Sequence, residues 1–419
     1  MRVLLTGAHG FIGGFIACAL REAGHTVIAA VRHPRGAQEI ACDFARDVDT
    51  AVWLPRLAGI DAVVNCAGIL RETAAQKFAA IHVDAPVALF RACVQAGVRK
   101  VVQVSALGEP GDGEFIASKH RADAALAELD LDWTVLRPGL VYSASGSYGG
   151  TSLLRALAAS PMFFLPQRGT QKLRPIAAED VGLAVVAALN AAPREIVQLV
   201  GPQAIGFVDY LRAWREWFGL KPAFEWHLPQ ALVTATVAFG EAFTAGPVCR
   251  VIANLLQRER VGMPDAAAHM KSQLALEPRS LDIALAQRPA TSSDLRDARL
   301  YTAVPTLRIT FALVWIISGL LGLGLPAAAL QAMVPSWPFA FAQALGRATG
   351  ALDLLLGVLL LIGLHVRRIE QLMLAMVTGY SIGIGLFAPQ HWLDPFGGLL
   401  KNFVLIAALW LLLALEPRE

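Results

Sequence analysis

The stretch that decides the fold is TGAHGFIG, residues Thr6–Gly13. It directly follows a short apolar run, Arg2–Thr6, and it opens a segment with helical spacing of apolar residues, Phe11–Ala23. A glycine-rich turn between a strand and a helix is typical of a dinucleotide-binding unit. The motif therefore predicts a nucleotide-binding fold at the start of the chain.

The glycines of this turn have separate physical roles. Gly7 allows the tight turn, Gly10 lets the backbone approach a pyrophosphate, and Gly13 lets the helix pack closely on the sheet. The free N–H groups at the start of the helix would bind the phosphates. The residues expected around the phosphates are Thr6, Gly7, Gly10, Phe11, Ile12 and Gly13.

Short β-branched runs alternate with helical segments over the first two hundred residues. The predicted strands are Arg2–Thr6, Thr26–Val31, Ala62–Asn65, Val101–Ser105 and Thr134–Arg137. Segments between them, such as Gln76–Ala96, have apolar residues at helical spacing. This alternation predicts an α/β fold, a doubly wound parallel Rossmann sheet with helices on both faces.

The tip of the second strand bears on the choice of cofactor. The strand ends Val31-Arg32-His33-Pro34, and no Asp or Glu occupies this tip. An acid there usually binds the ribose hydroxyls of NAD, whereas an arginine accommodates the 2′-phosphate of NADP. Arg32 therefore favours NADP(H) over NAD(H), and the alternative is a solvated loop arginine.

The composition is too apolar for a purely soluble protein. Of the 419 residues 55% are hydrophobic and 16% are charged, whereas soluble domains carry about 25% charged residues. The net charge of +3 is too balanced for a nucleic-acid-binding protein. Five dispersed cysteines, with no CxxC pair, predict reduced thiols and no metal site.

The excess hydrophobicity lies in the last third of the chain. Four apolar stretches each have a length that can cross a bilayer, and they predict an all-α, four-helix transmembrane domain. They are Ile309–Leu325, Phe339–Leu364, Gln371–Phe387 and Leu399–Leu415. The lipid bilayer is therefore an expected partner.

Basic residues predict the orientation of these spans. Arg367 and Arg368 lie in the second link, whereas the first link has no charge. Arg308 precedes the first span and Arg418 follows the fourth. The positive-inside rule then predicts a multi-pass protein of the inner membrane with both termini in the cytoplasm.

Some residues of the spans are unusual for a membrane. Small residues recur at four-residue spacing in three pairs, Ser318 with Gly322, Gly346 with Gly350, and Gly379 with Gly383, and they predict close helix packing. Arg347, Asp353 and Lys401 are ionisable, and they either face a functional interior or extend to the interface. The sequence leaves both alternatives open.

The chain divides into three predicted parts. Residues 1–225 form the Rossmann domain, 226–303 a helical cap or linker, and 304–419 the transmembrane domain. From about Gly201 to Leu300 the pattern becomes helical, with an amphipathic helix around Tyr210–Phe218 and an apolar segment, Pro229–Phe243.

The first half resembles the extended or atypical short-chain dehydrogenases/reductases, in particular the branch of NmrA-like proteins and of the related accessory subunit of respiratory complex I. The motifs that carry the resemblance are Thr6–Gly13, Asp43-Phe44, Val64–Gly68, Gly97–Gly108, Trp133–Gly139 and Arg174–Val181. The resemblance implies that Asp43 and Phe44 lie near the adenine. It also implies that Cys66, Ala67 and Gly68 line the ribose side of the cofactor, and that Lys119 and Pro138 belong to the cofactor site.

This family normally uses a serine and a Tyr-x-x-x-Lys motif for catalysis. Ser105 and Lys119 match, but Phe115 occupies the tyrosine position. The family tyrosine moves a proton at the substrate oxygen, and general acid–base catalysis is worth roughly 10² to 10⁴ in rate. Phenylalanine cannot do this.

Three interpretations follow from Phe115. Another donor replaces the tyrosine, with His120, Ser118 and Tyr142 as candidates. Alternatively, the reaction needs little acid catalysis, as in hydride transfer to a quinone or flavin. In the third interpretation the chain binds the dinucleotide without turnover, as a sensor or assembly factor.

The tail resembles the DoxX-like family of small membrane proteins, through Ala312–Leu320 and Asp394–Asn402. Some members of that family are linked to quinone chemistry. The two resemblances together imply a membrane-anchored NAD(P)H-dependent oxidoreductase with a lipophilic or quinone-like acceptor. The alternative is a catalytically silent NAD(P)H-binding scaffold, with a membrane protein or a second copy of the chain as partner.

Overall fold

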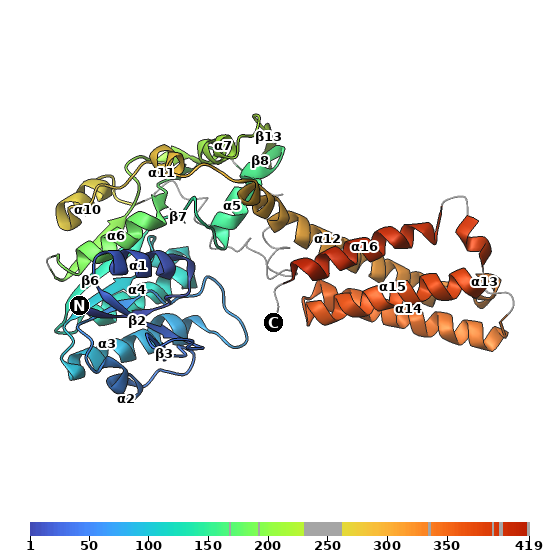
Figure 1. Cartoon of the computed structure of the whole chain (residues 1–419), viewed down its shortest axis with the longest axis horizontal. Coiled ribbons are helices and arrows are strands. Elements are labelled where there is room, and N and C mark those ends of the chain that lie inside the picture. Colours follow the sequence, from blue (N-terminus) through green and yellow to red (C-terminus); the bar gives the residue numbers. More distant parts are fainter. Residues whose placement is uncertain are drawn as a thin grey trace. The chain divides into compact units, whose positions relative to one another are not determined.

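The computed structural model describes residues 1–166, 169–191, 193–229, 262–333, 337–387, 389–393 and 397–416 (Figure 1). These residues form two compact units. The first holds residues 1–229 and 262–299, and the second holds residues 300–416, with the gaps just given. The three-part division stays a prediction. Residues 230–243 of the apolar segment, Cys249, Asp394 and Arg418 lie outside the described residues.

A parallel sheet is the centre of the first unit. Its strand order is β11-β6-β5-β4-β1-β2-β3, and every pair in it is parallel. The strands are β1 Arg2–Thr6, β2 Thr26–Val31, β3 Glu39–Ala41, β4 Ala62–Asn65, β5 Lys100–Val104, β6 Asp132–Pro138 and β11 Glu195–Leu199. The chain changes direction across the sheet between β1 and β4, where doubly wound sheets bind ligands.

Helices cover both faces of this sheet (Figure 1). On one face α1 (Phe11–Glu22) and α6 (Ala178–Ala188) pack on the strands, and on the other face α2 (Thr50–Trp53) and α3 (Ala85–Ala96) do so. Two apolar cores result, one on each side of the sheet. The predicted Rossmann class is confirmed.

Smaller elements continue the first unit. They are η1 Leu54–Leu57, η2 Ala79–Asp84, η3 Pro110–Asp112, α4 Glu114–Ala127, β7 Val141–Tyr142, α5 Gly150–Ala159, β8 Met162–Pro166, β9 Lys172–Leu173, β10 Ile176–Ala177, β12 Ile205–Gly206, α7 Phe207–Trp217, β13 Phe224–Leu228, α10 Ala266–Leu274 and α11 Leu281–Ala286. Within the region predicted as mainly helical, β13 is a strand that pairs in parallel with β8.

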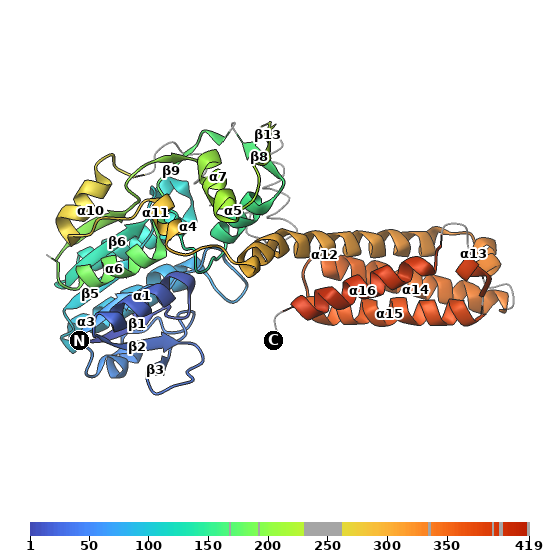
Figure 2. The same cartoon turned by 45° about the horizontal axis from the view of Figure 1, so that its top comes forward.

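The second unit is a bundle of apolar helices (Figure 2). Its elements are α12 Ser292–Gly324, which begins in the first unit, α13 Ala327–Met333, α14 Phe339–Leu361, α15 Val366–Phe387, η5 Pro389–Leu393 and α16 Leu400–Leu415. Three of them, α12, α14 and α15, are long and apolar enough to cross a membrane, and α16 is an apolar helix of 16 residues. The chain is therefore a membrane protein with several apolar helices.

Glycines bring α12 and α14 into backbone contact. A Cβ atom built at Gly319 would lie 2.4 Å from the Leu354 nitrogen, and one built at Gly322 would lie 3.0 Å from the Gly350 Cα. By contrast, a Cβ at Gly379 or Gly383 would meet nothing within 4 Å. The expectation of close packing therefore holds for α12 and α14 and is wrong for the pair on α15.

Candidate dinucleotide site

The glycine turn has the geometry of a phosphate cradle. Gly7 has φ +69°, and a Cβ built there would lie 2.6 Å from the Cys66 carbonyl oxygen. A Cβ at Gly13 would lie 2.0 Å from the Gly7 oxygen, so no side chain fits at either position. Gly10 begins α1 without a side-chain cap, which leaves the first N–H groups of α1 available for an anion.

A hydrogen-bonded row joins the carboxyl ends of three neighbouring strands beside this turn. The Thr6 hydroxyl donates to Asn65 Oδ1 at 2.5 Å, and Asn65 Nδ2 donates to Gln103 Oε1 at 2.7 Å. The backbone N–H groups of Cys66 and Ala67 donate to Thr6 Oγ1 at 3.2 and 3.3 Å. Thr6 therefore holds the Cys66–Gly68 segment against the turn.

Lys119 reaches the same edge of the sheet from α4. Lys119 is 7% exposed, and its Nζ donates to the carbonyl oxygens of Val104 at 3.0 Å and Ala67 at 3.3 Å. Burial lowers the pKa of this ammonium group. Because an ammonium has three protons, these two bonds leave one for a ligand.

Ser105 is buried, and its hydroxyl group is hydrogen-bonded to another side chain of the protein. Its hydroxyl donates to Asp123 Oδ2 at 2.8 Å, and the same oxygen accepts from Arg137 Nη2 at 2.9 Å. Ser105 thus lies at the end of β5, as expected from its place in the sequence, but its proton is directed to a buried ion pair. This geometry gives Ser105 a structural role.

Phe115 forms an apolar wall with two neighbours. Its ring lies 5.6 Å from the His82 ring and 6.3 Å from the Phe78 ring, between centroids. A Cβ built at Gly68 would lie 3.1 Å from Lys119 Nζ and 3.4 Å from His82 Nε2. The aromatic rings of phenylalanine and histidine therefore surround the position at which the resemblance would lead one to expect a tyrosine hydroxyl.

His82 was missed by the sequence analysis, and its hydrogen bonds fix its protonation. The Ile69 N–H donates to Nε2 at 3.0 Å, so Nδ1 carries the proton and donates to Ser118 Oγ at 2.8 Å. Ser118 in turn donates to the Phe115 carbonyl oxygen at 3.1 Å. Burial, helped by the Lys119 charge, lowers the pKa of His82 to about 2. A turn of π-helix, η2, carries this histidine, and such turns are frequent at functional sites.

The other candidate proton donors lie elsewhere. Tyr142 is 0% exposed, with its ring in edge contact with Tyr210 and Trp214 of α7. Its hydroxyl has no hydrogen-bond partner among the described residues, and burial raises its pKa. His120 Nε2 donates to the Ala106 oxygen at 3.0 Å. Neither geometry favours proton transfer to a ligand at the glycine turn.

The residues expected near the adenosine end lie at the ends of β2 and β3. Arg32 is exposed. Asp43 is half-buried and accepts from the Ala45 N–H at 3.1 Å, whereas Phe44 is buried against Trp53 with ring centroids 5.5 Å apart. Phe44 therefore belongs to the core.

An acid that the sequence analysis did not consider also reaches the turn. Glu39, on β3, lies with Oε1 2.9 Å from His9 Nε2, and His9 belongs to the glycine turn. The sequence alone did not indicate Glu39, because it comes several residues after the tip of β2. The pairing of β3 with β2 places Glu39 beside the glycine turn.

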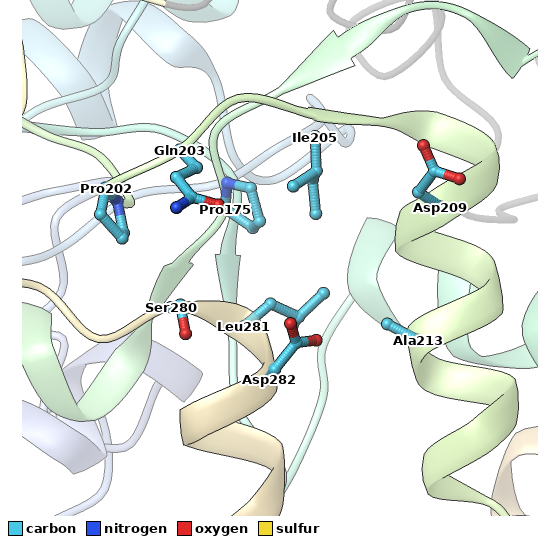
Figure 3. Close-up of a pocket in the computed structure, with 9 residues that line it drawn as sticks. All are labelled: Pro175, Pro202, Gln203, Ile205, Asp209, Ala213, Ser280, Leu281 and Asp282. Atoms are coloured by element: carbon cyan, nitrogen blue, oxygen red, sulfur yellow. The ribbon is translucent and has the colours of Figure 1, made fainter.

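Two of the cavities lined by described residues of the first unit bear on the site. One, of about 650 Å³, is lined by Ala8 and His9 of the turn, one side of α1 and residues 36–39. The other, of about 140 Å³, lies between β12, α7 and α11 and includes Asp209 and Asp282 (Figure 3). Ligand pockets usually measure about 300 to 1,000 Å³, so the cavity at the turn fits a ligand better.

Four cysteines of the first unit lie among the described residues. Among the described residues no group of three His, Cys, Asp or Glu side chains could hold a metal ion. The thiols of Cys18, Cys42, Cys66 and Cys93 are free. Burial raises the pKa of Cys66, beside the turn, to about 11, which keeps it a neutral thiol.

The cradle, the buried lysine and the sheet edge form a candidate dinucleotide site in a Rossmann domain, which a membrane domain follows. Residues 7–192 match the family described as NAD(P)H-binding, and residues 312–410 match the DoxX-like family. The chain thus joins an NAD(P)H-binding Rossmann domain to a DoxX-like domain.

Curated relatives match parts of the chain. The chain is 26% identical over 225 residues to the photosystem II assembly factor Ycf39 of Synechocystis, covering 51% of this chain and 66% of that protein. It is 31% identical over 123 residues to a dihydroflavonol 4-reductase of Zea mays, covering 25% and 34%. It also matches an uncharacterized protein of Mycobacterium tuberculosis at 26% identity, over 34% of this chain and only 15% of that one.

Solved structures show the same fold at low identity. The protein MoeE5 in complex with UDP-glucose and NAD aligns with TM-score 0.53 and 21% identity, covering 71% of this chain and 99% of that one. A short-chain dehydrogenase/reductase superfamily protein of Agrobacterium tumefaciens with bound NAD aligns with TM-score 0.52 and 15% identity, covering 73% and 99%. At these identities the likeness concerns the fold alone.

Proposed function

We propose that this protein is a membrane-anchored NAD(P)H-dependent oxidoreductase that reduces a lipophilic, quinone-like acceptor. The observation that carries the proposal is Phe115, which puts an apolar ring where this class has its proton donor, beside a retained Lys119. A carbonyl substrate would need that donor. A quinone needs it less, because hydride addition gives a hydroquinone anion, whose charge is stabilised by the newly aromatic ring.

The residues of the site would hold the cofactor and exclude water. The backbone N–H groups at the start of α1 bind the pyrophosphate, and Gly7 and Gly13 keep the cradle open. Lys119 binds the nicotinamide ribose with its third proton. Phe115, Phe78 and His82 keep the neighbouring surface apolar. The bound dinucleotide supplies a hydride, and the acceptor takes up one further proton.

Steady-state kinetics of the full chain in detergent test this function. We expect oxidation of NADPH with a soluble quinone analogue and none with aldehydes or ketones. Lys119→Met should weaken cofactor binding about 10- to 100-fold, the effect of one lost charged hydrogen bond. Lys271→Met is the matched control, because Lys271 lies exposed on α10, and it should change neither rate nor affinity. Binding of NADPH without oxidation by any quinone would overturn the proposal.

A second candidate is a dinucleotide-binding assembly factor without turnover. Two observations favour it: the missing acid at Phe115, and the similarity to a protein named as a photosystem II assembly factor. Its partner would be a membrane protein complex or a second copy of this chain. Binding without oxidation, in the experiment above, is the result that this candidate predicts.

We further propose that NADP(H) is the preferred cofactor and that Arg32 binds its 2′-phosphate. The exposed guanidinium at the end of β2 can meet a 2′-phosphate, although Glu39 at the turn would favour the 2′-hydroxyl of NAD. Arg32→Ala should weaken NADPH binding about tenfold and leave NADH binding within about twofold. Arg91→Ala on the exposed side of α3 is the control. Equal losses for both dinucleotides would refute the role of Arg32.

The membrane orientation remains part of the proposal. The basic residues Arg367 and Arg368 support an inner-membrane protein with both termini in the cytoplasm. This orientation would place the dinucleotide site where NAD(P)H is made. A reporter fused to the C-terminus should be active only in the cytoplasm, and periplasmic activity would reverse the orientation.

A further inference from the structure

An acid lies within the second spanning helix of the membrane unit. Asp353 is eight residues from the end of α14 at Leu361, so roughly 12 Å of helix separates it from the nearer helix end. The residue is only 7% exposed. An ionisable side chain at this depth is costly and usually marks a functional site.

The partners of Asp353 are hydroxyl groups from two other helices. Ser318 Oγ of α12 lies 3.1 Å from Asp353 Oδ2, and Tyr380 Oη of α15 lies 3.5 Å from Oδ1. Glycines at the crossing of α12 and α14 hold Ser318 close to the acid, because the two backbones touch at Gly319 and Gly350. Neutral hydroxyls bind a carboxyl group without neutralising a charge.

The charged groups of the helices around Asp353 have other partners or lie at other levels. Arg308 pairs with Glu370 at 3.1 Å and with Glu416, and it lies ten residues, roughly 15 Å, before Ser318 on α12. Arg347 donates to the Leu325 oxygen at 2.9 Å, at the end of α12. Arg367 and Arg368 lie at the start of α15, and Lys401 lies at the start of α16. The basic residues in the first part of α12, Arg296 and Arg299, lie at least 19 residues before Ser318.

Among the described residues, therefore, no cation pairs with Asp353. An unpaired carboxylate buried in an apolar bundle costs several kcal/mol. The protonated form avoids this cost, because it has one O–H donor and can still accept from the remaining hydroxyl. The packing around Asp353 thus favours the neutral acid.

A second hydrogen-bonded group lies beside the partners of this acid. Ser381, which follows Tyr380 in α15, accepts at Oγ from Asn402 Nδ2 at 2.9 Å and donates to the Val377 oxygen at 2.7 Å. Asn402 lies two residues after the start of α16 at Leu400. Further polar side chains thus extend from the neighbour of Tyr380 to the beginning of α16.

We propose that Asp353, with Ser318 and Tyr380, is a proton-binding site inside the membrane domain. Its carboxyl group is protonated at neutral pH and exchanges this proton with water. The ligand of the site is the proton, and the chemistry is the reversible loss of H⁺ from a carboxylic acid. This site does not depend on the oxidoreductase function, so either can fail alone.

Infrared spectroscopy of the full chain in liposomes tests the site. We expect the difference spectrum of wild type minus Asp353→Asn at neutral pH to contain the C=O stretch of a protonated carboxyl group. The band should shift in D₂O and disappear at high pH. Tyr380→Phe should shift the pH at which it disappears. The near-isosteric amide keeps the contacts to Ser318 and Tyr380, and circular dichroism checks the fold.

Glu370→Gln is the matched control, because Glu370 is equally buried but paired with Arg308. The difference spectrum of wild type minus Glu370→Gln should contain carboxylate bands and no band of a protonated carboxyl group. Carboxylate bands alone for Asp353 at neutral pH, or a protonated band that stays unchanged after hours in D₂O, would overturn the proposal. If Asp353→Asn fails to fold, wild type is treated with a hydrophobic carbodiimide, which modifies protonated carboxyls. Modification of Asp353 supports the site, and modification confined to Glu370 overturns it.

Discussion

At the scale of single residues, Phe115 stands where the resemblance expects a tyrosine, and the hydrogen bonds of His82 order the backbone around it. Phe115 has no ionisable proton, and His82 acts through its hydrogen bonds to the neighbouring segments. Its ring holds Ile69 in the loop after β4 and, through Ser118, the first turn of α4. His82 is thus a positioning residue for the loop that contacts Lys119.

This role predicts a pH dependence of stability. The pKa of His82 is about 2 in the folded protein and near 6.5 when unfolded, so below about pH 6.5 the unfolded state binds the extra proton. Stability should therefore fall as the pH drops from about 6.5, by up to about 1.4 kcal/mol per pH unit. Urea unfolding of wild type and His82→Gln between pH 7 and 4 measures it.

In that experiment His82→Gln should flatten the pH dependence of the unfolding free energy. His33→Gln, at an exposed histidine of the loop after β2, should leave it unchanged. Parallel pH curves for wild type and His82→Gln would show that His82 binds a proton in the folded state as readily as in the unfolded one.

The sequence was informative for residues whose roles are local. The tight turn at Gly7 and the close packing at Gly13 were predicted correctly, because strand, turn and helix are contiguous. Tyr142 could not be placed, because its burial depends on Tyr210 and Trp214 far along the chain. Glu39 was overlooked for the same reason, since only the pairing of β3 with β2 brings it to the turn.

At the scale of elements, local patterns predicted the bounds of β1, β2 and β4, because each is a short, mostly buried run of mainly apolar residues. The strand β13 was missed. Its partner β8 lies about sixty residues earlier, and the pairing of Trp226 with Phe164 leaves no periodic signal. The segment predicted as one helix over 76–96 begins with η2, because His82 turns toward Ile69 and Ser118.

The crossing of α12 and α14 gives a test of element packing. Gly319→Ala should destabilise the membrane unit by about 1 to 3 kcal/mol, because the new Cβ would lie 2.4 Å from the Leu354 nitrogen. Thermal unfolding of the full chain in detergent, followed by circular dichroism, measures the loss.

Gly383→Ala on α15 is the matched control, because its Cβ would meet nothing within 4 Å. It should leave stability unchanged or raise it slightly, since alanine favours a helix over glycine. Equal destabilisation by both changes would mean that backbone contact at Gly319 contributes nothing specific.

At the scale of the whole molecule, the unusual composition is an average of two parts. A Rossmann domain holds the dinucleotide cradle, and an apolar bundle makes the chain a membrane protein. The sequence predicted both parts, because each has a continuous local signal. It could not predict the acceptor, because a substrate pocket is assembled from residues far apart in the chain.

The central claim is that NAD(P)H bound at the glycine turn passes a hydride to a lipophilic acceptor without a tyrosine acid. The most direct measurement is the stoichiometry of NADPH oxidation by the full chain in liposomes that contain a quinone. The account predicts one quinone reduced for each NADPH oxidised, and a large loss of rate in Lys119→Met but not in Lys271→Met. Saturable NADPH binding with no quinone reduced would contradict it.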